Sequence, residues 1–212
     1  MKLTSGKTVR LTLYGLLTGI LILMACTPLG YLNIGPLAIT FNMIPVAIAA
    51  ITLGPAGGAI IGAVFGMTSF LQCLGVLGMS GMGAATFAIS PFLTFVQRML
   101  PRVLDGFLLG YIYRFMKKHS AAFPACAVTG FFAAFLNTLM FMGLLVLLFG
   151  NTAYVKNLMG GHNVIVGVCL MIGVNAIFEM LASTLITGAV GTALVKAGFV
   201  ARRSEHVKKA AA

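Results

Sequence analysis

Acidic residues are almost absent from this sequence: three aspartates and glutamates stand against 14 lysines and arginines. Charged residues of both signs make up only 8% of the 212 residues, whereas 60% are hydrophobic. A soluble domain needs far more polar surface than this, so we expect an integral membrane protein. Because apolar segments occupy nearly the whole chain, we expect no separate ATPase or other large catalytic domain.

Further absences exclude kinds of site. Three acidic residues are too few for a carboxylate-rich metal site. No Ser-His-Asp, Cys-His or paired-carboxylate set is present, which argues against a small membrane enzyme. The four cysteines are isolated on apolar segments without a Cys-x-x-Cys pair, so we expect buried thiols. We therefore predict no catalytic residue, no cofactor and no metal in this chain.

The basic residues lie where they would orient membrane spans. Of the 14 lysines and arginines, 11 lie near the two termini or just after Tyr113. These positions are typical of the cytoplasmic face of a membrane protein, so the positive net charge does not indicate binding to nucleic acid. We predict an all-α, six-helix membrane protein whose N and C termini are both cytoplasmic. The whole chain forms one domain, with residues 1–9 and 200–212 as cytoplasmic tails. The predicted spans are residues 10–27, 42–54, 56–72, 91–115, 121–149 and 164–196.

The second span is short and follows an irregular stretch. Asn42 is expected to cap a helix that ends at Gly54, too short to cross a bilayer core of about 30 Å unless the bilayer thins or the preceding loop dips into it. That loop, residues 27–40, contains two prolines and two glycines and cannot be a regular helix. We predict that it lies outside and is partly extended.

Glycines mark two further features. Those between residues 57 and 66 are expected to pack helices closely, as are Gly15 and Gly19 in the first span. The stretch 73–89 is uncharged and contains four glycines and two methionines. It suits a mobile external lid with an apolar underside, although a re-entrant segment that only packs is the alternative.

Residues 90–119 carry Arg98, Arg102 and Asp105 inside an apolar run. A charge at bilayer depth costs at least about 2.5–3.5 kcal/mol, so it normally faces a partner or a cavity. Asp105 lies three residues after Arg102 and could neutralise it, which leaves Arg98 to meet an anionic or strongly polar ligand. The alternative is that both arginines are structural and pair with Asp105 and Glu179.

The other polar residues of the apolar segments and outer loops are expected to converge near Arg98. At 1.5 Å per residue, Arg98 lies about 10 Å and Arg102 about 16 Å below Pro91, at outer to middle depth. Such residues could instead make only interhelical hydrogen bonds. The candidate ligand contacts besides Arg98 are Asn33, Asn42, Gln72, Gln97, Asn137, Asn163, Asn175 and Glu179.

Several of these patterns occur together in one known family. The sequence FNMIPVAIAAITLGPAGGAIIGAVFGMTSF (residues 41–70), LPRVLDGFLLGYIYRFMKK (residues 100–118), Asn137–Thr138, Asn175 and Glu179 resemble the S components of energy-coupling factor (ECF) vitamin transporters. The resemblance implies a multi-pass protein of a bacterial plasma membrane that binds a water-soluble vitamin from outside. It also implies partners, a transmembrane coupling subunit (EcfT type) and two ATPase subunits.

The resemblance also suggests how the chain meets its partner and what it binds. The family presents an Ala-x-x-x-Ala pattern to the coupling subunit, and the matching positions here are Gly15 and Gly19. Among the family's ligands we favour pantothenate, because a small acid would use Arg98 and several amides. A pocket with few aromatic residues outside the loops and no tryptophan argues against large stacked rings such as folate or riboflavin. Pyridoxine, folate, riboflavin and cobalamin are the alternatives, as is a stand-alone secondary carrier.

Overall fold

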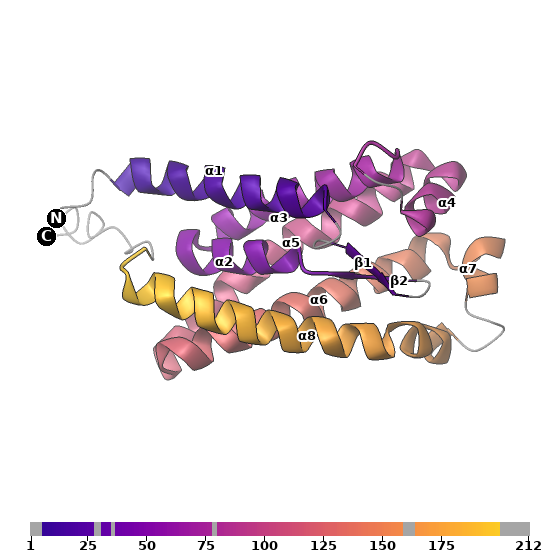
Figure 1. Ribbon diagram of the computed structural model, residues 1–212. Helices are drawn as coiled ribbons and strands as arrows, with labels where there is room; N and C mark the ends of the chain where they lie inside the picture. Colours follow the sequence, from indigo (N-terminus) through magenta and orange to yellow (C-terminus); the bar gives the residue numbers. More distant parts are fainter. Residues whose placement is uncertain (1–5, 28–30, 35–36, 78–79, 159–163, 200–212) are drawn as a thin grey trace, which may run out of the picture.

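The protein is a bundle of long helices with a short β-hairpin between them (Figure 1). The computed structural model describes residues 6–27, 31–34, 37–77, 80–158 and 164–199. The elements are α1 (Gly6–Ala25), β1 (Tyr31–Ile34), β2 (Leu37–Thr40), α2 (Met43–Leu53), α3 (Pro55–Cys73), α4 (Gly81–Ile89), α5 (Pro91–His119), α6 (Ala122–Phe149), α7 (Ala153–Leu158) and α8 (Val164–Lys196).

Glycine, proline and serine set the helix boundaries. Gly54 separates α2 from α3 and has a φ of 83°, a conformation that only glycine adopts readily. Pro55 then opens α3, and Pro91 opens α5, in the first turn where a missing N–H costs nothing. The Oγ atom of Ser90 caps α5 by accepting a hydrogen bond from the backbone N–H of Leu93 at 3.4 Å.

Local predictions for the loops need correction. The stretch 27–40 is partly extended, as predicted, but its extended parts pair as an antiparallel hairpin in which Tyr31 lies opposite Thr40. The second half of the stretch 73–89, predicted to be a lid loop, is the helix α4. Asn42 occupies the N-cap position of α2, as predicted, but its side chain makes no capping hydrogen bond.

Four of the described helices are long and apolar enough to cross a membrane: Lys7–Ala25, Pro55–Cys73, Ala122–Phe149 and Ala176–Lys196. The helix α2 is apolar but has only 11 residues. The helix α5 has 29 residues, yet it carries Arg98, Arg102 and Asp105 and ends in a basic cluster. Hydropathy alone therefore does not mark α5 as a span.

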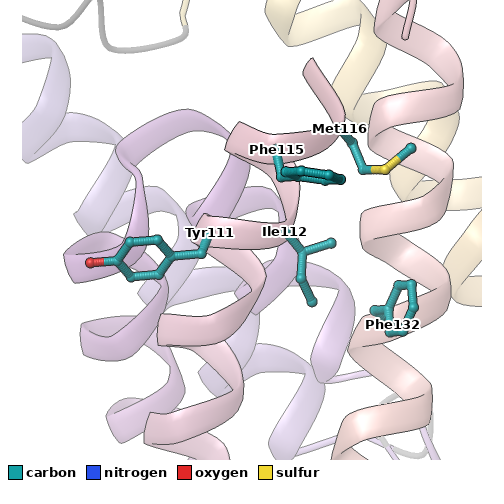
Figure 2. A pocket seen from close by; sticks show the side chains of 5 residues that line it. All are labelled: Tyr111, Ile112, Phe115, Met116 and Phe132. Carbon is teal, nitrogen blue, oxygen red and sulfur yellow. The ribbon is translucent and has the colours of Figure 1, made fainter. Parts of the chain in front are cut away.

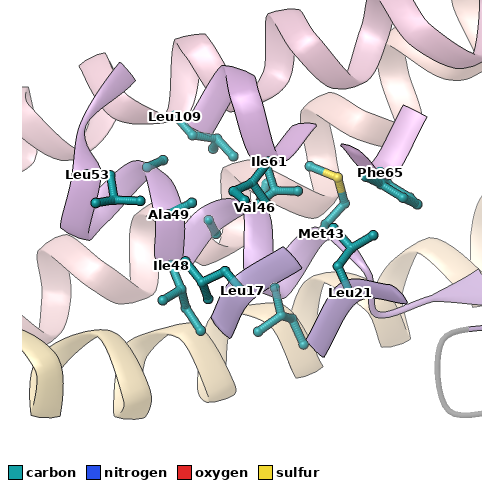
Figure 3. Packing of buried hydrophobic residues seen from close by; sticks show 14 of the residues in the cluster. Leu17, Leu21, Met43, Val46, Ile48, Ala49, Leu53, Ile61, Phe65 and Leu109 are labelled. Atoms are coloured by element: carbon teal, nitrogen blue, oxygen red, sulfur yellow. The ribbon is translucent and has the colours of Figure 1, made fainter. Parts of the chain in front are cut away.

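The helix α2 forms the centre of the bundle. All 11 of its residues are buried, and it contacts α1, α3, α5, α6 and α8. Leu17 and Leu21 of α1, Ile61 and Phe65 of α3 and Leu109 of α5 pack around it (Figure 3). A helix that is apolar on every face is stable only when it is enclosed, which explains why the sequence of α2 shows no polar stripe.

Glycines let α3 and α5 approach until their backbones touch. A Cβ atom on Gly58 would collide with the carbonyl oxygen of Gly106, and one on Gly62 would collide with that of Arg102. In lipid the hydrophobic effect does not drive helices together, so they associate through close van der Waals packing, which small residues at the crossing point permit. The prediction of close packing between residues 57 and 66 is thus confirmed, and this contact sets the position of Arg102.

We expect Gly106→Ala to lower the free energy of unfolding by about 1–3 kcal/mol, because the added methyl group forces α3 and α5 apart. Gly143→Ala is the matched control, since a Cβ atom there meets nothing within 4 Å. Thermal unfolding in detergent measures both. If Gly106→Ala unfolds at the same temperature as Gly143→Ala, the close crossing does not contribute to stability.

The two ends of the bundle differ in charge. The start of α1, the end of α5 and the end of α8 lie toward the same end of the bundle (Figure 1). They carry Lys7 and Arg10, the cluster from Arg114 to Lys118, and Lys196. We call this the basic end. The hairpin, α4 and α7 lie toward the opposite end, which we call the hairpin end.

Candidate functional site

Arg98 is a buried cation at the meeting point of three helices. Its side chain is 6% exposed. Its Nη1 atom lies 3.4 Å from the Oγ atom of Ser69 on α3, and its guanidinium carbon lies 5.0 Å from the ring centroid of Phe141 on α6. Its Nε and Nη2 atoms have no hydrogen-bond partner in the described part of the chain. Buried N–H groups of a cation are costly to leave unpaired, so this side of Arg98 is suited to an acceptor.

Arg102 lies one turn further along α5 and shares Phe141 with Arg98. Its guanidinium carbon lies 5.0 Å from the centroid of Phe141 and 4.5 Å from that of Phe65. Its Nη1 atom donates to the backbone oxygen of Arg98 at 2.9 Å. Neither carboxylate oxygen of Asp105 accepts a hydrogen bond from a described residue. The proposed pairing of Arg102 with Asp105 therefore involves no hydrogen bond between described atoms and stays a prediction.

Buried uncharged polar groups lie within one helical turn of Arg98 or of Phe141. Thr94 and Gln97 lie on α5 within one turn of Arg98 and are fully buried. Asn137 lies one turn before Phe141 and is 5% exposed. Both amide atoms of Gln97, the Oδ1 atom of Asn137 and the hydroxyl of Thr94 lack hydrogen-bond partners among the described residues. Native interiors rarely contain several such groups together, so they mark this region as a polar site.

Tyr154 of α7 lies close enough to Arg98 for the two to interact electrostatically. Burial raises the pKa of its phenol, and the nearby Arg98 guanidinium opposes this rise. Tyr154 is half-buried and packs against the cluster of Met82, Met142 and Phe149 at the hairpin end. The short helix α7 thus places a phenol within electrostatic range of Arg98. We call Arg98, Arg102, Gln97, Asn137 and Phe141 the arginine cluster.

Glu179 joins the β-hairpin to α8. Its Oε1 atom accepts a hydrogen bond from the backbone N–H of Thr40 at 2.6 Å, and its carboxylate lies within electrostatic range of Arg102. The residue is buried, near the middle of α8. The last residue of the hairpin is therefore held deep in the bundle, next to the arginine cluster.

We expect Glu179→Ala to release the hairpin, since a hydrogen bond to a charged group contributes about 1.5–3 kcal/mol. Glu179→Gln keeps an acceptor oxygen and should have a smaller effect. Hydrogen–deuterium exchange of the amide of Thr40 measures this, with an expected acceleration of about tenfold or more in Glu179→Ala. Thr184→Ala, which removes a hydroxyl bonded only within α8, is the control. Equal exchange in all variants would show that Glu179 does not hold the hairpin.

The remaining predicted ligand residues are not all in the cluster. The Nε2 atom of Gln72 donates to the backbone oxygens of Ala25, at 3.2 Å, and Leu77, at 3.5 Å, so it ties α1 to the end of α3. Asn42 is fully buried before α2, and its backbone N–H lies 3.4 Å from the Oγ1 atom of Thr40. Three further candidates have side chains outside the described part of the chain: Asn33 in β1, Asn175 in α8, and Asn163, none of whose atoms is described.

Sequence reasoning missed the aromatic residues of the site. Phe141 lies beneath the guanidinium groups of both arginines, and Phe65 lies beneath that of Arg102, contacts that the sequence analysis did not predict. The position of Phe141, one helical turn after Asn137, was the available indication, because residues four apart share a face. The sequence contained no indication that Ser69 or Tyr154 lies near Arg98, because only the tertiary structure brings them there.

The arrangement favours binding over chemistry. A buried guanidinium, two amides and a hydroxyl offer donors and acceptors to an anionic, hydrogen-bonding molecule of small size. Among the described residues there is no group of three His, Cys, Asp or Glu side chains that could hold a metal ion. The aromatic rings leave apolar surface for the rest of a ligand.

Comparison with known proteins gives the family. The model of the family "ECF transporter, substrate-specific component" matches residues 9–191. The pantothenate transporter PanT of Leuconostoc mesenteroides subsp. mesenteroides is 29% identical over 203 residues, which cover 91% of this chain and 95% of the relative. The family match contains every element that contributes to the arginine cluster. The resemblance seen in the sequence is thereby confirmed: this multi-pass membrane protein belongs to the substrate-specific components of ECF transporters.

Proposed function

We propose that this chain binds pantothenate from outside the cell and passes it inward as part of an ECF importer. As a member of the family, it is the substrate-binding component of a transporter and not an enzyme. The coupling subunit and the two ATPases that the family implies would supply the energy. The name of the Leuconostoc relative supports pantothenate as the ligand.

Arg98 is the observation that carries the proposal. Pantothenate has one carboxylate, one amide and two hydroxyl groups. The Nε and Nη2 atoms of Arg98 can donate to the carboxylate, and Gln97 and Asn137 can pair with the amide and hydroxyls. Hydrogen bonds between a guanidinium and a carboxylate are about twice as strong as neutral ones, so a small acid gains most at this site.

Mass spectrometry of the small molecule retained by the purified chain tests the ligand directly. We expect pantothenate at about one molecule per chain, and calorimetric titration of the emptied protein should show tight binding of pantothenate and none of pyridoxine or riboflavin. Retention of another vitamin would reject pantothenate and leave the family assignment intact. A chain that binds no vitamin under either measurement would reject the proposed function.

We also propose six spans with both termini in the cytoplasm. The hairpin and α2 together form the second crossing. The backbone N–H of Thr40, at the end of the hairpin, donates a hydrogen bond to Glu179. Glu179 lies about 23 Å along α8 from Val164, at 1.5 Å per residue, so the hairpin already reaches this depth. The 11 residues of α2 then extend about 16 Å further toward the basic end. The positive-inside rule assigns that end to the cytoplasm.

Cysteine labelling in intact cells checks this orientation. In a background without native cysteines, Lys156→Cys in α7 should react fully with a membrane-impermeant maleimide. Lys118→Cys at the end of α5 should react only after the cells are made permeable, because the positive-inside rule places it in the cytoplasm. The reverse pattern would overturn the orientation, and labelling of both from outside would overturn the number of spans.

A further inference from the structure

An apolar groove lies on the periphery of the bundle, near the basic end. Four residues of α5 and one of α6 line a groove of about 420 Å³ (Figure 2): Tyr111, Ile112, Phe115, Met116 and Phe132. The side chains of Ile112, Met116 and Phe132 lie in the space between the two helices, and the hydroxyl of Tyr111 points away from it. The lining side chains come from different residues than those of the arginine cluster.

The groove is open on the side where a bilayer would lie. Tyr111 is 51% exposed and Phe115 is 63% exposed. Exposed apolar side chains are ordinary on a lipid-facing surface and alone indicate no specific partner. A hollow between two spanning helices differs from a flat lipid face, because it can hold one acyl chain in fixed contacts on several sides.

Positive charges lie beside the groove, toward the end of α5. Arg114 lies over the ring of Tyr111, with its guanidinium carbon 5.8 Å from the ring centroid. Lys118 is three residues after Phe115 and so lies on the same helix face, and the ring of His119 lies 5.0 Å from that of Phe115. Within the described chain no carboxylate forms a salt bridge with Arg114 or Lys118.

We propose that the groove, together with Arg114 and Lys118, binds an anionic phospholipid of the cytoplasmic leaflet. The phosphate lies at the two cations, and the first part of one acyl chain lies between α5 and α6. From Lys118 to Tyr111 the site extends about 10 Å along α5, at 1.5 Å per residue. Basic pockets between spanning helices on the cytoplasmic side are suited to anionic lipid headgroups. The proposal rests on the orientation argued above.

A lipid fits these observations better than a helix of another protein. Two exposed cations above an apolar groove complement a molecule with one anionic end and one apolar tail. The helix α1, with its exposed glycine pair, packs on α2 and α3, whereas the groove belongs to α5 and α6. A lipid in the groove would therefore leave that helix accessible.

Native mass spectrometry of the detergent-purified full chain tests the proposal, with phosphatidylglycerol and phosphatidylcholine of identical acyl chains as probes. We expect phosphatidylglycerol to be retained preferentially. The double variant Arg114→Gln with Lys118→Gln should lower that retention by at least about fivefold. Lys7→Gln with Lys196→Gln removes the same charge at the same end of the bundle and should not. Lys118→Gln alone serves if the double variant does not fold.

A groove-filling variant and a competitor separate the parts of the site. Ile112→Trp should lower retention with both cations intact, and glycerol 3-phosphate should not displace the lipid. Pantothenate binding should be unchanged in these variants, so failure of the lipid proposal and failure of the proposed function are distinguishable. Equal retention of the two lipids, or equal loss in the charge control, would overturn the proposal. Displacement of the lipid by glycerol 3-phosphate would also overturn the proposal. The same holds if these variants fail to assemble with the coupling subunit but retain the lipid as the natural chain does.

Discussion

Arg98→Ala is expected to weaken pantothenate binding by about 10- to 100-fold, because a hydrogen bond to a charged group contributes about 1.5–3 kcal/mol. Arg98 is 6% exposed, and its guanidinium has two nitrogen atoms without partners in the described chain, so these atoms are available to the ligand. Calorimetric titration of the purified protein measures the loss.

The nature of the contact can be tested with a ligand that lacks the carboxylate. Panthenol replaces the carboxylate of pantothenate by an alcohol, so it should bind the natural protein weakly and lose little more in Arg98→Ala. Arg98→Lys keeps the charge but not the planar fork, and should recover part of the affinity. If Arg98→Ala is folded and binds pantothenate normally, Arg98 has a structural role and the alternative pairing with acidic residues is favoured.

Gly15→Leu combined with Gly19→Leu is expected to lower cellular uptake by at least about tenfold and to leave ligand binding unaltered. A Cβ atom at either glycine meets nothing within 4 Å, so bulky side chains there disturb no packing inside this chain. Close backbone approach between helices in lipid requires small residues, and the loss of about 1.4 kcal/mol of packing gives a tenfold effect. Uptake by cells with the complete transporter measures the change.

Gly143→Leu is the matched control, because Gly143 is an exposed glycine on α6 with equally open surroundings. Its uptake should equal that of the natural chain. Unchanged uptake in the double variant would remove Gly15 and Gly19 from the interface. Accumulation of pantothenate by the purified chain alone in sealed vesicles, on an ion gradient and without ATP, would support the stand-alone carrier and reject the importer subunit.

The long helices could be predicted from the sequence because their evidence is local. The last helix, predicted for residues 164–196, is found as Val164–Lys196, and the fifth segment differs by one residue at its start. The hairpin and α4 were not predicted. Their glycines and prolines indicated only that a regular long helix was excluded, and pairing of Tyr31 with Thr40 depends on a partner strand.

The candidate site was predictable only in part. Arg98 and Arg102 could be identified as candidate site residues because they lie in an apolar run. A charge at bilayer depth is costly and therefore needs a partner or a cavity, whatever the details of helix packing. The role of Gln72 was not predictable, since its amide binds backbone oxygens at Ala25 and Leu77 rather than the arginine cluster. Nothing in the sequence near Tyr154 indicated that it lies within electrostatic range of Arg98.

The sequence by itself determined that this is a membrane protein, which stretches form long helices, and which end of the bundle is basic. Segment length, hydropathy and charge suffice for these because each is a property of neighbouring residues and the surrounding solvent. Only the tertiary structure decided that Phe65, Ser69 and Phe141 contact the arginines and that Thr40 reaches Glu179. These contacts join distant parts of the chain. For Phe65 and Ser69 the placement follows from the glycine-mediated crossing of α3 and α5, where backbone atoms come into close contact.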